Sequence, residues 1–455
     1  MKKNVDMTTG SSFKKILAFS IPTALGLMLQ NLYSLGDTLI VSLSRGKEAA
    51  TGVNLTESLS FLILGFGSGI AAGFGIVLSQ FVGAKDENGM KKSLAASITL
   101  SAVIGVIITV LTVIFAGPLL TLMKTDGLYY DFSLKYITAI FAGFMFNLFY
   151  NLAAQIMRAL GDSKTPLIIL VLAATINILL DSALFITNWS VAWAGWATVI
   201  SQAISATIGF ILILKKYPEL RLKRTDFKFS AKLAIYHLTT GLPMGFQFTV
   251  TAIGCMIQQS AFNALPDPRY AMAQSTGSKI DNVFNSLLMG AANTMAVYTG
   301  QNYGAKKIDR IKKGMLAGMA SGLIYTAVAT AAAIPLCVPF AKFLLKGAEN
   351  VVYDWVFRYI TTQACFYYVL YILMMFRQCL QGLGYSVLTI FGGVTELVFR
   401  YLAAITLAVN FGYAGACFSN PLAWTGGAAF FVISYFAVIK KTEKKLLSPS
   451  DNFLK

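Results

Sequence analysis

The residues best suited to bind an ion or a proton are two aspartates inside apolar segments. Asp37 and Asp181 each stand within a long hydrophobic run, and Asn177 and Thr198 lie near Asp181 in the sequence. Carboxylate, amide and hydroxyl oxygens are hard ligands that suit an alkali cation such as Na⁺. Two neighbouring carboxylates can instead share a proton, because their negative charges repel one another. The sequence leaves H⁺ and Na⁺ open as coupling ions and predicts no other cofactor.

The segments that carry these groups place them at a similar depth in a membrane. Asp37 is about 15 residues past Pro22, or about 22 Å along a helix, and Asp181 is about 16 residues past Thr165. Thr198 lies about eight residues into a run that enters from the opposite side. We therefore expect three helices to bring these side chains into one layer. Buried acids in a membrane are costly, which favours a functional role over hydrogen bonding between helices.

Further polar residues inside apolar runs are expected to line a substrate cavity or support the site. Asn147 and Asn151 are four residues apart and therefore share one helix face, as do Asn177 and Asp181. Such residues also join helices at little cost, so inter-helix bonding is the alternative for them. The full set of expected cavity or supporting residues is Gln30, Asn147, Asn151, Gln258 and Asp281.

Composition places the chain in a lipid bilayer. Hydrophobic residues make up 56% of it, charged residues 13%, and the mean hydropathy is +0.65, which is outside the range of soluble proteins. The net charge is +17, and the Lys and Arg residues that cause it lie beside the ends of the apolar runs. This placement is explained by membrane topology and by contact with anionic lipid headgroups. We therefore expect membrane lipids, and no nucleic acid, as partners.

The apolar pattern predicts an all-α membrane protein with twelve transmembrane helices in two six-helix lobes. An even number of helices in each lobe makes the lobes parallel repeats. The predicted domains are an N-terminal lobe at 1–216, a cytosolic linker at 217–232, a C-terminal lobe at 233–440 and a cytosolic tail at 441–455. The predicted spans are 14–44, 54–82, 92–117, 131–158, 165–188, 190–215, 233–262, 270–301, 312–340, 351–381, 386–409 and 412–439.

The two halves repeat one another with a shift of 221 residues but differ in charge. Pro22 recurs as Pro243, whereas Asp37 corresponds to the neutral Gln258. The window that corresponds to Asp181 contains Arg400, with Glu396 four residues earlier, which predicts an ion pair on one helix face. We hypothesise that the second lobe carries a built-in cation where the first binds a mobile one, the alternative being a buried pair that fixes helix register.

A proline, three glycines and several charged residues within or beside the apolar runs have predicted structural roles. Pro22 is expected to act as a hinge that lets the first helix bend, and Gly65, Gly69 and Gly73 are spaced for close helix packing. Asp281 either attracts a cationic substrate or forms a structural salt bridge. His237 is expected to be exposed or interfacial, and Arg377 to reach toward the cytosol.

The distribution of basic residues sets the expected location. Lys and Arg gather beside the N-terminus, the middle linker and the C-terminus, and basic residues favour the cytosolic side. We expect a multi-pass protein of the bacterial inner (plasma) membrane, monomeric, with both termini cytosolic. One histidine and five dispersed cysteines offer no cluster for an enzyme's active site.

These motifs together resemble the multidrug and toxic compound extrusion (MATE) transporters. The resemblance covers nearly the whole chain, in the following residues: Pro22 and Asp37; Gly83, Ala84 and Lys85 and again Gly304, Ala305 and Lys306; Arg158, Leu160, Gly161, Asp162 and Pro166; Asn177 and Asp181; Gly195, Ala197 and Thr198. It implies twelve helices in two lobes that expel organic cations by alternating access, driven by inward flow of protons or sodium.

The resemblance also implies roles for residues and a competing function. Asp37, Asn177, Asp181 and Thr198 correspond to the cation site of the first lobe, the possible Na⁺ ligands. Some members carry an acid in the seventh span where this chain has Thr251, which favours coupling through the first lobe. The alternative is a flippase for lipid-linked precursors, a related fold in which Lys279, Arg377 and Arg400 would contact an anionic headgroup.

Overall fold

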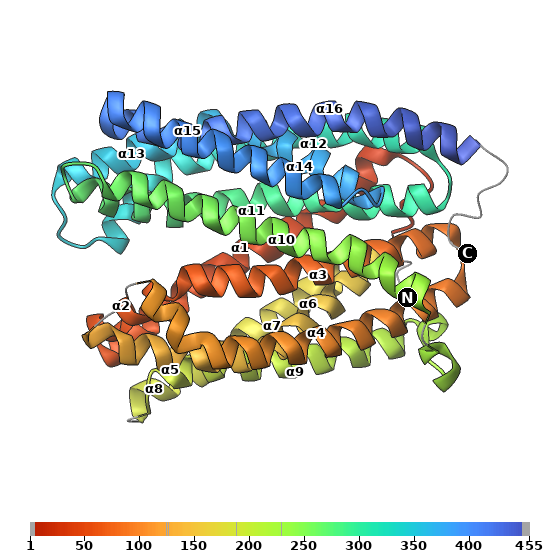
Figure 1. The fold of residues 1–455 in the computed structure, drawn as a ribbon, viewed down its shortest axis with the longest axis horizontal. Helices are drawn as coiled ribbons and strands as arrows, with labels where there is room; N and C mark the ends of the chain where they lie inside the picture. The colour runs from red at the N-terminus through yellow and green to blue at the C-terminus, as the bar shows by residue number, and fades with distance from the viewer. Residues whose placement is uncertain (1–4, 124, 126, 188, 229, 448–455) are drawn as a thin grey trace. The chain divides into compact units, whose positions relative to one another are not determined.

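Helices form every regular element of the part of the chain that the structure describes. The computed structural model describes residues 5–123, 125, 127–187, 189–228 and 230–447. Figure 1 shows its helices as bundles of long, roughly parallel rods. Helices satisfy their own backbone hydrogen bonds, as a lipid environment requires.

The helices group into two compact units. Unit 1 comprises Leu29–Thr249, and unit 2 comprises Val5–Met28 and the chain from Val250 onward. The long helices α1 (Ser12–Arg45) and α10 (Ala231–Asn263) therefore belong in part to each unit. Unit 1 also holds α2 (Lys47–Leu55), α3 (Glu57–Ala84), α4 (Glu87–Leu122), α5 (Leu128–Ala142), α6 (Phe144–Ala159), α7 (Lys164–Asp181), α8 (Ala183–Ile186) and α9 (Ala192–Lys216). Unit 2 holds α11 (Arg269–Gly304), α12 (Ile308–Leu344), α13 (Asn350–Cys365), α14 (Tyr367–Gly382), α15 (Val387–Cys417) and α16 (Ser419–Leu447).

These units differ from the predicted lobes, 1–216 and 233–440, in the first halves of α1 and α10. Glycines explain the difference, because they let helix backbones touch. A Cβ atom on Gly73 of α3 would stand 2.4 Å from the Cα of Gly241 on α10, and one on Gly290 of α11 would stand 2.3 Å from the Cα of Ala24 on α1. The first half of α10 thus packs within unit 1, and the first half of α1 within unit 2.

The predicted close packing of the α3 glycines is confirmed, and the segment predicted as a linker contains regular turns. A Cβ on Gly69 would lie 2.5 Å from the carbonyl oxygen of Met244. The predicted linker 217–232 contains two 3-10 turns, Pro218–Leu220 and Arg224–Phe227, and Leu220 is fully buried. The predicted tail is helical to Leu447 and otherwise lies outside the described residues.

The predicted spans correspond to helices of the structure with three differences. Of the described helices, nine are long and apolar enough to cross a membrane unaided. The predicted spans 131–158 and 351–381 are bent pairs, with angles of 50° between α5 and α6 and 49° between α13 and α14. The remaining span, α11, was expected to be apolar but has polar residues mixed with apolar ones, and it buries Gln274, Thr276, Asp281, Ser286 and Thr294. It completes the twelve.

The backbone repeats its unusual conformations in the two halves of the chain. Lys85, which ends α3, has φ 56°, and Lys306, 221 residues later, has φ 57°. This left-handed conformation is uncommon for a residue other than glycine and closes a helix. Gly161 and Gly384, which follow α6 and α14, have φ of 82° and 87°. The sequence repeat is therefore also a repeat of backbone geometry.

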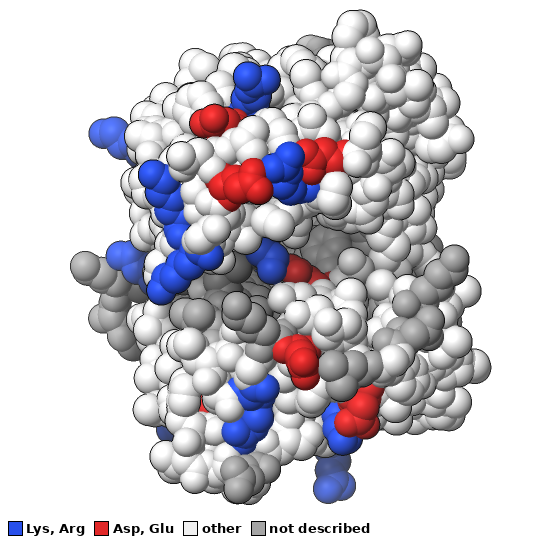
Figure 2. All heavy atoms as spheres, turned by 90° about the vertical axis from the view of Figure 1, so that its left-hand side faces the viewer, with Lys and Arg blue, Asp and Glu red and all other residues white. Residues whose placement is uncertain are grey.

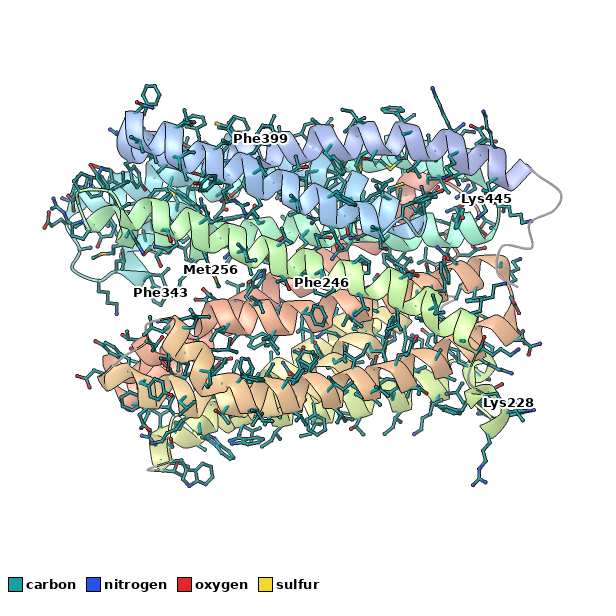
Figure 3. All side chains as sticks on the ribbon, viewed as in Figure 1. Lys228, Phe246, Met256, Phe343, Phe399 and Lys445 are labelled. Atoms are coloured by element: carbon teal, nitrogen blue, oxygen red, sulfur yellow. The ribbon has the colours of Figure 1, made fainter. Side chains whose placement is uncertain are left out.

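Apolar side chains on the outer surfaces suit contact with lipid. On α4 a stripe of exposed residues comprises Val103, Val106, Ile107, Val110, Leu111, Ile114 and Phe115. Figure 3 shows Phe399 projecting from α15, where it is exposed, whereas Lys228 stands beyond the end of α9. Such apolar surfaces would be a liability in water and are expected in a bilayer.

Charged residues gather at the helix ends. Figure 2 faces the end where α2 and α5 begin and shows basic and acidic side chains interspersed. Lys135 pairs with Asp131 at 2.6 Å in unit 1, and Arg269 pairs with Asp267 at 2.7 Å and Glu349 at 2.5 Å in unit 2. Exposed pairs of this kind contribute little to stability, so they mark the polar rim of each unit.

Candidate functional site

Three helices of unit 1 bring the predicted ion-binding residues together. Asp37 lies on the second half of α1, Asp181 is the last residue of α7, and Thr198 lies on α9. Asn177 is one turn before Asp181, and both side chains are buried, with exposures of 1% and 0%. The expectation of a shared layer is met by this geometry.

The contacts among these four residues form one cluster. Asn177 Nδ2 donates to Thr198 Oγ1 at 3.3 Å, and Thr198 Oγ1 also reaches the Ala194 carbonyl oxygen at 3.2 Å. The carboxyl groups of Asp37 and Asp181 lie within hydrogen-bonding reach of each other, and Asp181 adjoins the Asn177 amide. The two acids thus face one another across the contact between α1 and α7.

The cluster contains more acceptor oxygens than donors. Within the described part of the chain, no donor reaches Asp37 Oδ1, either carboxylate oxygen of Asp181, or Asn177 Oδ1. The Asn177 amide group donates to Thr198 Oγ1. Two facing carboxylates form a hydrogen bond only when one carries a proton, and buried acceptors without donors are costly. The arrangement is suited to a proton or a cation among these oxygens.

Two tyrosines complete the surroundings of the acid pair and were not predicted. Tyr33 lies one turn before Asp37 on α1, and Tyr136 lies on α5. Each is close enough to Asp37 and Asp181 to interact with both electrostatically. The spacing of four residues between Tyr33 and Asp37 is a signal that could have identified Tyr33. The sequence holds no comparable signal for Tyr136.

The expected supporting asparagines bond to each other instead of to the acid pair. Asn151 Nδ2 donates to the carbonyl oxygen of Asn147 at 2.9 Å and to its Oδ1 at 3.2 Å, along α6. Gln30 lies seven residues before Asp37 on α1 and is half-buried. Pro22 lies inside the continuous helix α1. Their roles as cavity, supporting or hinge residues stay predictions.

Asp162 holds the end of α7 that is opposite Asp181. Its carboxylate accepts from the backbone N–H groups of Lys164 and Thr165, both at 3.1 Å, from Tyr217 Oη at 3.0 Å, and from Lys216, with which it forms a salt bridge. Burial alone would raise the pKa of Asp162, but the hydrogen bonds from Lys216 and Thr165 outweigh it and lower the pKa below its usual value. The start of α7 is thereby fixed to the end of α9.

Unit 2 contains a buried acid with a different environment. Asp281 on α11 is 3% exposed, and its Oδ1 accepts from Tyr367 Oη at 2.7 Å while its Oδ2 accepts from Asn285 Nδ2 at 2.7 Å. Both oxygens therefore have donors. Asp281 thus takes part in a hydrogen-bonded network, and the predicted alternative of a structural salt bridge does not match its partners.

The predicted ion pair of unit 2 has a different partner. The salt bridge of Glu396 is with Arg377 of α14, at 3.7 Å, while Arg400 interacts with Glu396 only electrostatically. The prediction that Arg377 reaches the cytosol is wrong, because its side chain is 7% exposed. Pairing across helices depends on tertiary packing, which the spacing of four residues within α15 does not report.

His237 was expected at a surface and is fully buried. Its Nε2 lies 3.0 Å from Ser93 Oγ and its Nδ1 lies 2.9 Å from the Leu233 carbonyl oxygen. A neutral imidazole that donates from Nδ1 and accepts at Nε2 satisfies both contacts. The ring also packs edge-on against Phe74. His237 therefore joins α10 to α3 and α4 within unit 1.

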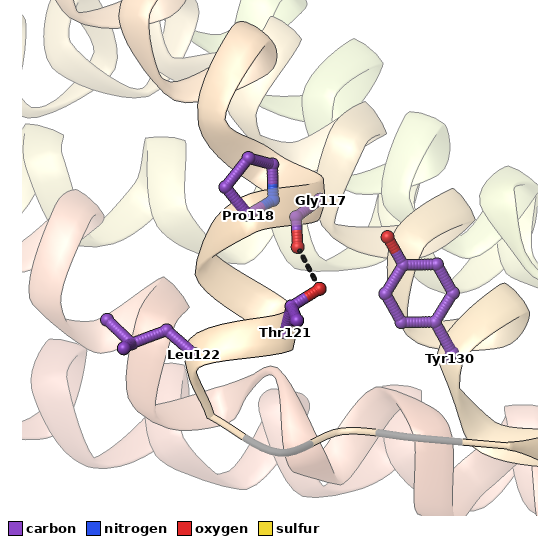
Figure 4. A pocket seen from close by; sticks show the side chains of 5 residues that line it. All are labelled: Gly117, Pro118, Thr121, Leu122 and Tyr130. Carbon is purple, nitrogen blue, oxygen red and sulfur yellow. Dashed lines mark hydrogen bonds between the residues drawn. The ribbon is translucent and has the colours of Figure 1, made fainter.

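A surface hollow in unit 1 lies apart from these residues. It has a volume of about 780 Å³ and is lined by Gly117, Pro118, Thr121, Leu122 and Tyr130 (Figure 4). Thr121 donates to the carbonyl oxygen of Gly117 at 3.2 Å. The hollow contains none of the predicted site residues, so it is a feature of the end of α4.

Comparison with known proteins gives one matching family and several similar proteins. The family model described as MatE matches residues 22–182 and 243–409, one segment in each half of the repeat. The probable multidrug resistance protein YpnP of Bacillus subtilis (strain 168) is 28% identical over 68% of this chain and 69% of its own length. A protein described as an FAD transporter from Shewanella oneidensis is 24% identical over 84% of this chain and 85% of its own length.

Solved structures share the fold. One described as the outward-facing conformation of a multidrug resistance MATE family transporter of the MOP superfamily has a TM-score of 0.91 and 21% identity, over 97% of this chain and 99% of that one. A MATE protein in complex with MaL6 has a TM-score of 0.89 and 22% identity, over 98% and 100%. The fold is therefore that of twelve helices in two lobes.

Proposed function

Because this chain belongs to the MatE family of multidrug and toxic compound extrusion transporters, which are transporters and not enzymes, we propose that it is a secondary antiporter. It expels organic cations in exchange for H⁺ or Na⁺ by alternating access. The names of two relatives, a probable multidrug resistance protein and a multidrug export protein, support efflux. We propose organic cations as the substrates.

The single observation that carries the proposal is the acid pair of unit 1. Asp181 is fully buried and neither of its carboxylate oxygens has a donor among the described residues. Ionisable residues within a membrane are costly and mark ion pathways. The cost falls when a proton or Na⁺ enters among the oxygens of Asp37, Asp181, Asn177 and Thr198.

Coupling follows if the ion and the drug prefer different states of the transporter. The ion enters at Asp37 and Asp181, cancels negative charge there and weakens the binding of a cationic drug. An ion can shift the equilibrium only by its differential affinity for the two states. Pro22 removes one backbone hydrogen bond from α1, so the helix that carries Asp37 can bend when the charge of Asp37 changes.

In this proposal the protein spans a bacterial inner membrane several times. Both termini are cytosolic and the functional unit is a monomer that contacts lipid. Basic residues near the N-terminus, the segment after α9 and the end of α16 support this orientation.

A flippase for lipid-linked precursors is the second candidate. The observation that favours it is the pair of buried arginines in unit 2, Arg377 and Arg400, which suit an anionic headgroup. The carboxylate oxygens of the acid pair in unit 1 that have no hydrogen-bond donor among the described residues favour cation exchange instead. Movement of a lipid-linked phosphate between leaflets of vesicles, without any ion gradient, would support the flippase.

The proposal is tested by transport in proteoliposomes. A fluorescent organic cation is followed under separately imposed proton and sodium gradients. The wild type should transport it under at least one gradient, and Asp37→Asn should abolish that transport while the protein still folds. Asp131→Asn is a matched control, because Asp131 is exposed and pairs with Lys135; it should transport normally. Normal export by Asp37→Asn would refute the role of the acid pair.

A further inference from the structure

Buried polar atoms that lack partners differ between the acid pair of unit 1 and the corresponding positions of unit 2. At the acid pair of unit 1 they are acceptor oxygens, on Asp37, Asp181 and Asn177. In unit 2, Gln258 corresponds to Asp37 and Arg400 corresponds to Asp181 with a shift of 219. There the atoms without a hydrogen-bond partner in the described chain include three donors, Gln258 Nε2, Arg377 Nε and Arg400 Nε.

The three donors lie on α10, α14 and α15, which are linked through Arg400 and Glu396. The guanidinium of Arg400 lies directly over Gly254 of α10, because a Cβ at Gly254 would stand 2.0 Å from Arg400 Nη1. Gln258 is one turn further along the same face of α10. Arg377 reaches the cluster through Glu396, at 3.7 Å. In unit 1 the position of Gly254 is occupied by Tyr33, so the glycine provides the space for the arginine.

The cluster carries an excess of positive charge. Two guanidinium groups surround the single carboxylate of Glu396, and all three side chains are more than nine-tenths buried. Glu396 Oε1 is within salt-bridge distance of Arg377 but makes no hydrogen bond. Glu396 packs against α16, since a Cβ at Gly427 would stand 2.7 Å from Glu396 Cγ. One carboxylate cannot neutralise two arginines, and a buried charge without a partner is unfavourable.

We propose that Gln258, Arg377 and Arg400 form an anion-binding site in unit 2. It takes one negatively charged group, either the carboxylate of an organic compound or a small inorganic anion. The amide N–H of Gln258 and the Nε–H of both arginines donate to the anion, and its charge balances the second guanidinium. Guanidinium groups suit carboxylates because their N–H groups match the two oxygens. This site is independent of cation coupling at Asp37 and Asp181.

The proposal is tested by anion binding to the purified full-length protein in detergent. The probes are chloride and benzoate, each as its N-methylglucamine salt so that sodium is absent, and the readout is the midpoint of thermal unfolding against anion concentration. An anion should raise the midpoint of the wild type. Gln258→Leu and Arg400→Gln should each weaken this response about tenfold or more, as loss of a hydrogen bond to a charged group implies.

Arg158→Gln provides the matched control. Arg158 is a half-buried arginine of unit 1 whose buried Nε also lacks a partner in the described chain, and its replacement should leave the anion response unchanged. A response to benzoate alone supports the carboxylate of an organic compound, and a response to both probes supports a general monoanion site. If Arg400→Gln does not fold, Gln258→Leu decides, because it removes a buried amide without changing charge.

Two results would overturn the proposal. The first is a wild-type protein that neither anion stabilises. The second is a response that Gln258→Leu retains in full or that Arg158→Gln removes. Neither result bears on ion-driven export, which is measured separately through Asp37.

Discussion

Unit 1 and unit 2 share a backbone plan and carry opposite chemistry within it. Both have a lysine in the left-handed conformation after the second span of their repeat, Lys85 after α3 and Lys306 after α11. Both pack a glycine against a neighbouring backbone, Gly73 at Gly241 and Gly290 at Ala24. The difference lies in the side chains at corresponding buried positions: the carboxylates Asp37 and Asp181 in unit 1, and the amide Gln258 and the guanidinium of Arg400 in unit 2.

The comparison shows that fold and chemistry depend on different residues of this chain. Glycines and helix-ending conformations fix how the helices cross, and they recur in both halves. The charges at the positions of Asp37 and Asp181 are replaced in the second half by Gln258 and Arg400, with Gly254 providing the space for the larger side chain. A duplicated scaffold has therefore acquired two different polar sites.

Copying the second unit's residue into the first should have the largest effect. Asp181→Arg places a fixed cation where we propose a mobile ion, so gradient-driven export should fall by about 100-fold, the upper end of ordinary coupling. The assay is transport of a fluorescent cation in proteoliposomes, with circular dichroism as a check on folding. Export at the wild-type rate would show that the two units do not differ in function as their charges suggest.

Removing the acid from the arginine cluster should be the next largest effect, now on stability. Glu396→Gln leaves two buried guanidinium groups without a carboxylate and should lower the free energy of unfolding by about 3 kcal/mol. Arg377→Met leaves Glu396 with Arg400, a neutral pair, and should cost less. Thermal unfolding in detergent compares the two variants, and an equal or reversed order would contradict the charge balance of unit 2.

Filling the helix crossings should affect both units alike. Gly73→Leu and Gly290→Leu each place a side chain where another backbone lies within 2.4 Å, and each should lower the free energy of unfolding by about 2 kcal/mol. Gly36→Leu is the control, because a Cβ there meets nothing within 4 Å. A large loss in one unit and none in the other would show that the repeated crossings are not equivalent.

The smallest predicted effect concerns Asp162. Asp162→Asn removes the charge that accepts from Lys216 and should cost about 1 kcal/mol at neutral pH. Because the pKa of Asp162 is lowered by folding, its contribution is present above the unfolded value of about 3.9 and is lost as pH falls through the lowered value. The stability gap between wild type and variant, measured by thermal unfolding, should therefore narrow below about pH 4. A gap that is independent of pH would contradict this.

Much of the fold and of the site in unit 1 was predictable from the sequence. Hydrophobic run lengths located the spans, because a bilayer fixes the length of a helix that crosses it. The constant rise of a helix placed Asp37, Asp181 and Thr198 at one depth. The small residues of α3 predicted its close packing. These inferences rely on distances along one helix, which sequence reports well.

Contacts between helices far apart in sequence were not predictable in the same way. Arg377 meets Glu396, and His237 meets Ser93, because of how whole helices rotate and pack. The bend after α5 lies at Gly143, which packs against Val199, and the bend after α13 lies at Phe366, which packs against Phe418. The division of α1 and α10 between two units follows from glycine contacts at Ala24 and Gly241 that no single-helix pattern reveals.

The most direct test of the account is equilibrium binding of tetraphenylphosphonium to the purified protein at stepped concentrations of protons and of sodium. The account predicts that affinity for this cation falls as one of the two ions rises, and that the dependence disappears in Asp37→Asn and Asp181→Asn but persists in Asp131→Asn. An ion dependence that survives in both buried-aspartate variants would contradict the claim that the acid pair of unit 1 couples ion to drug.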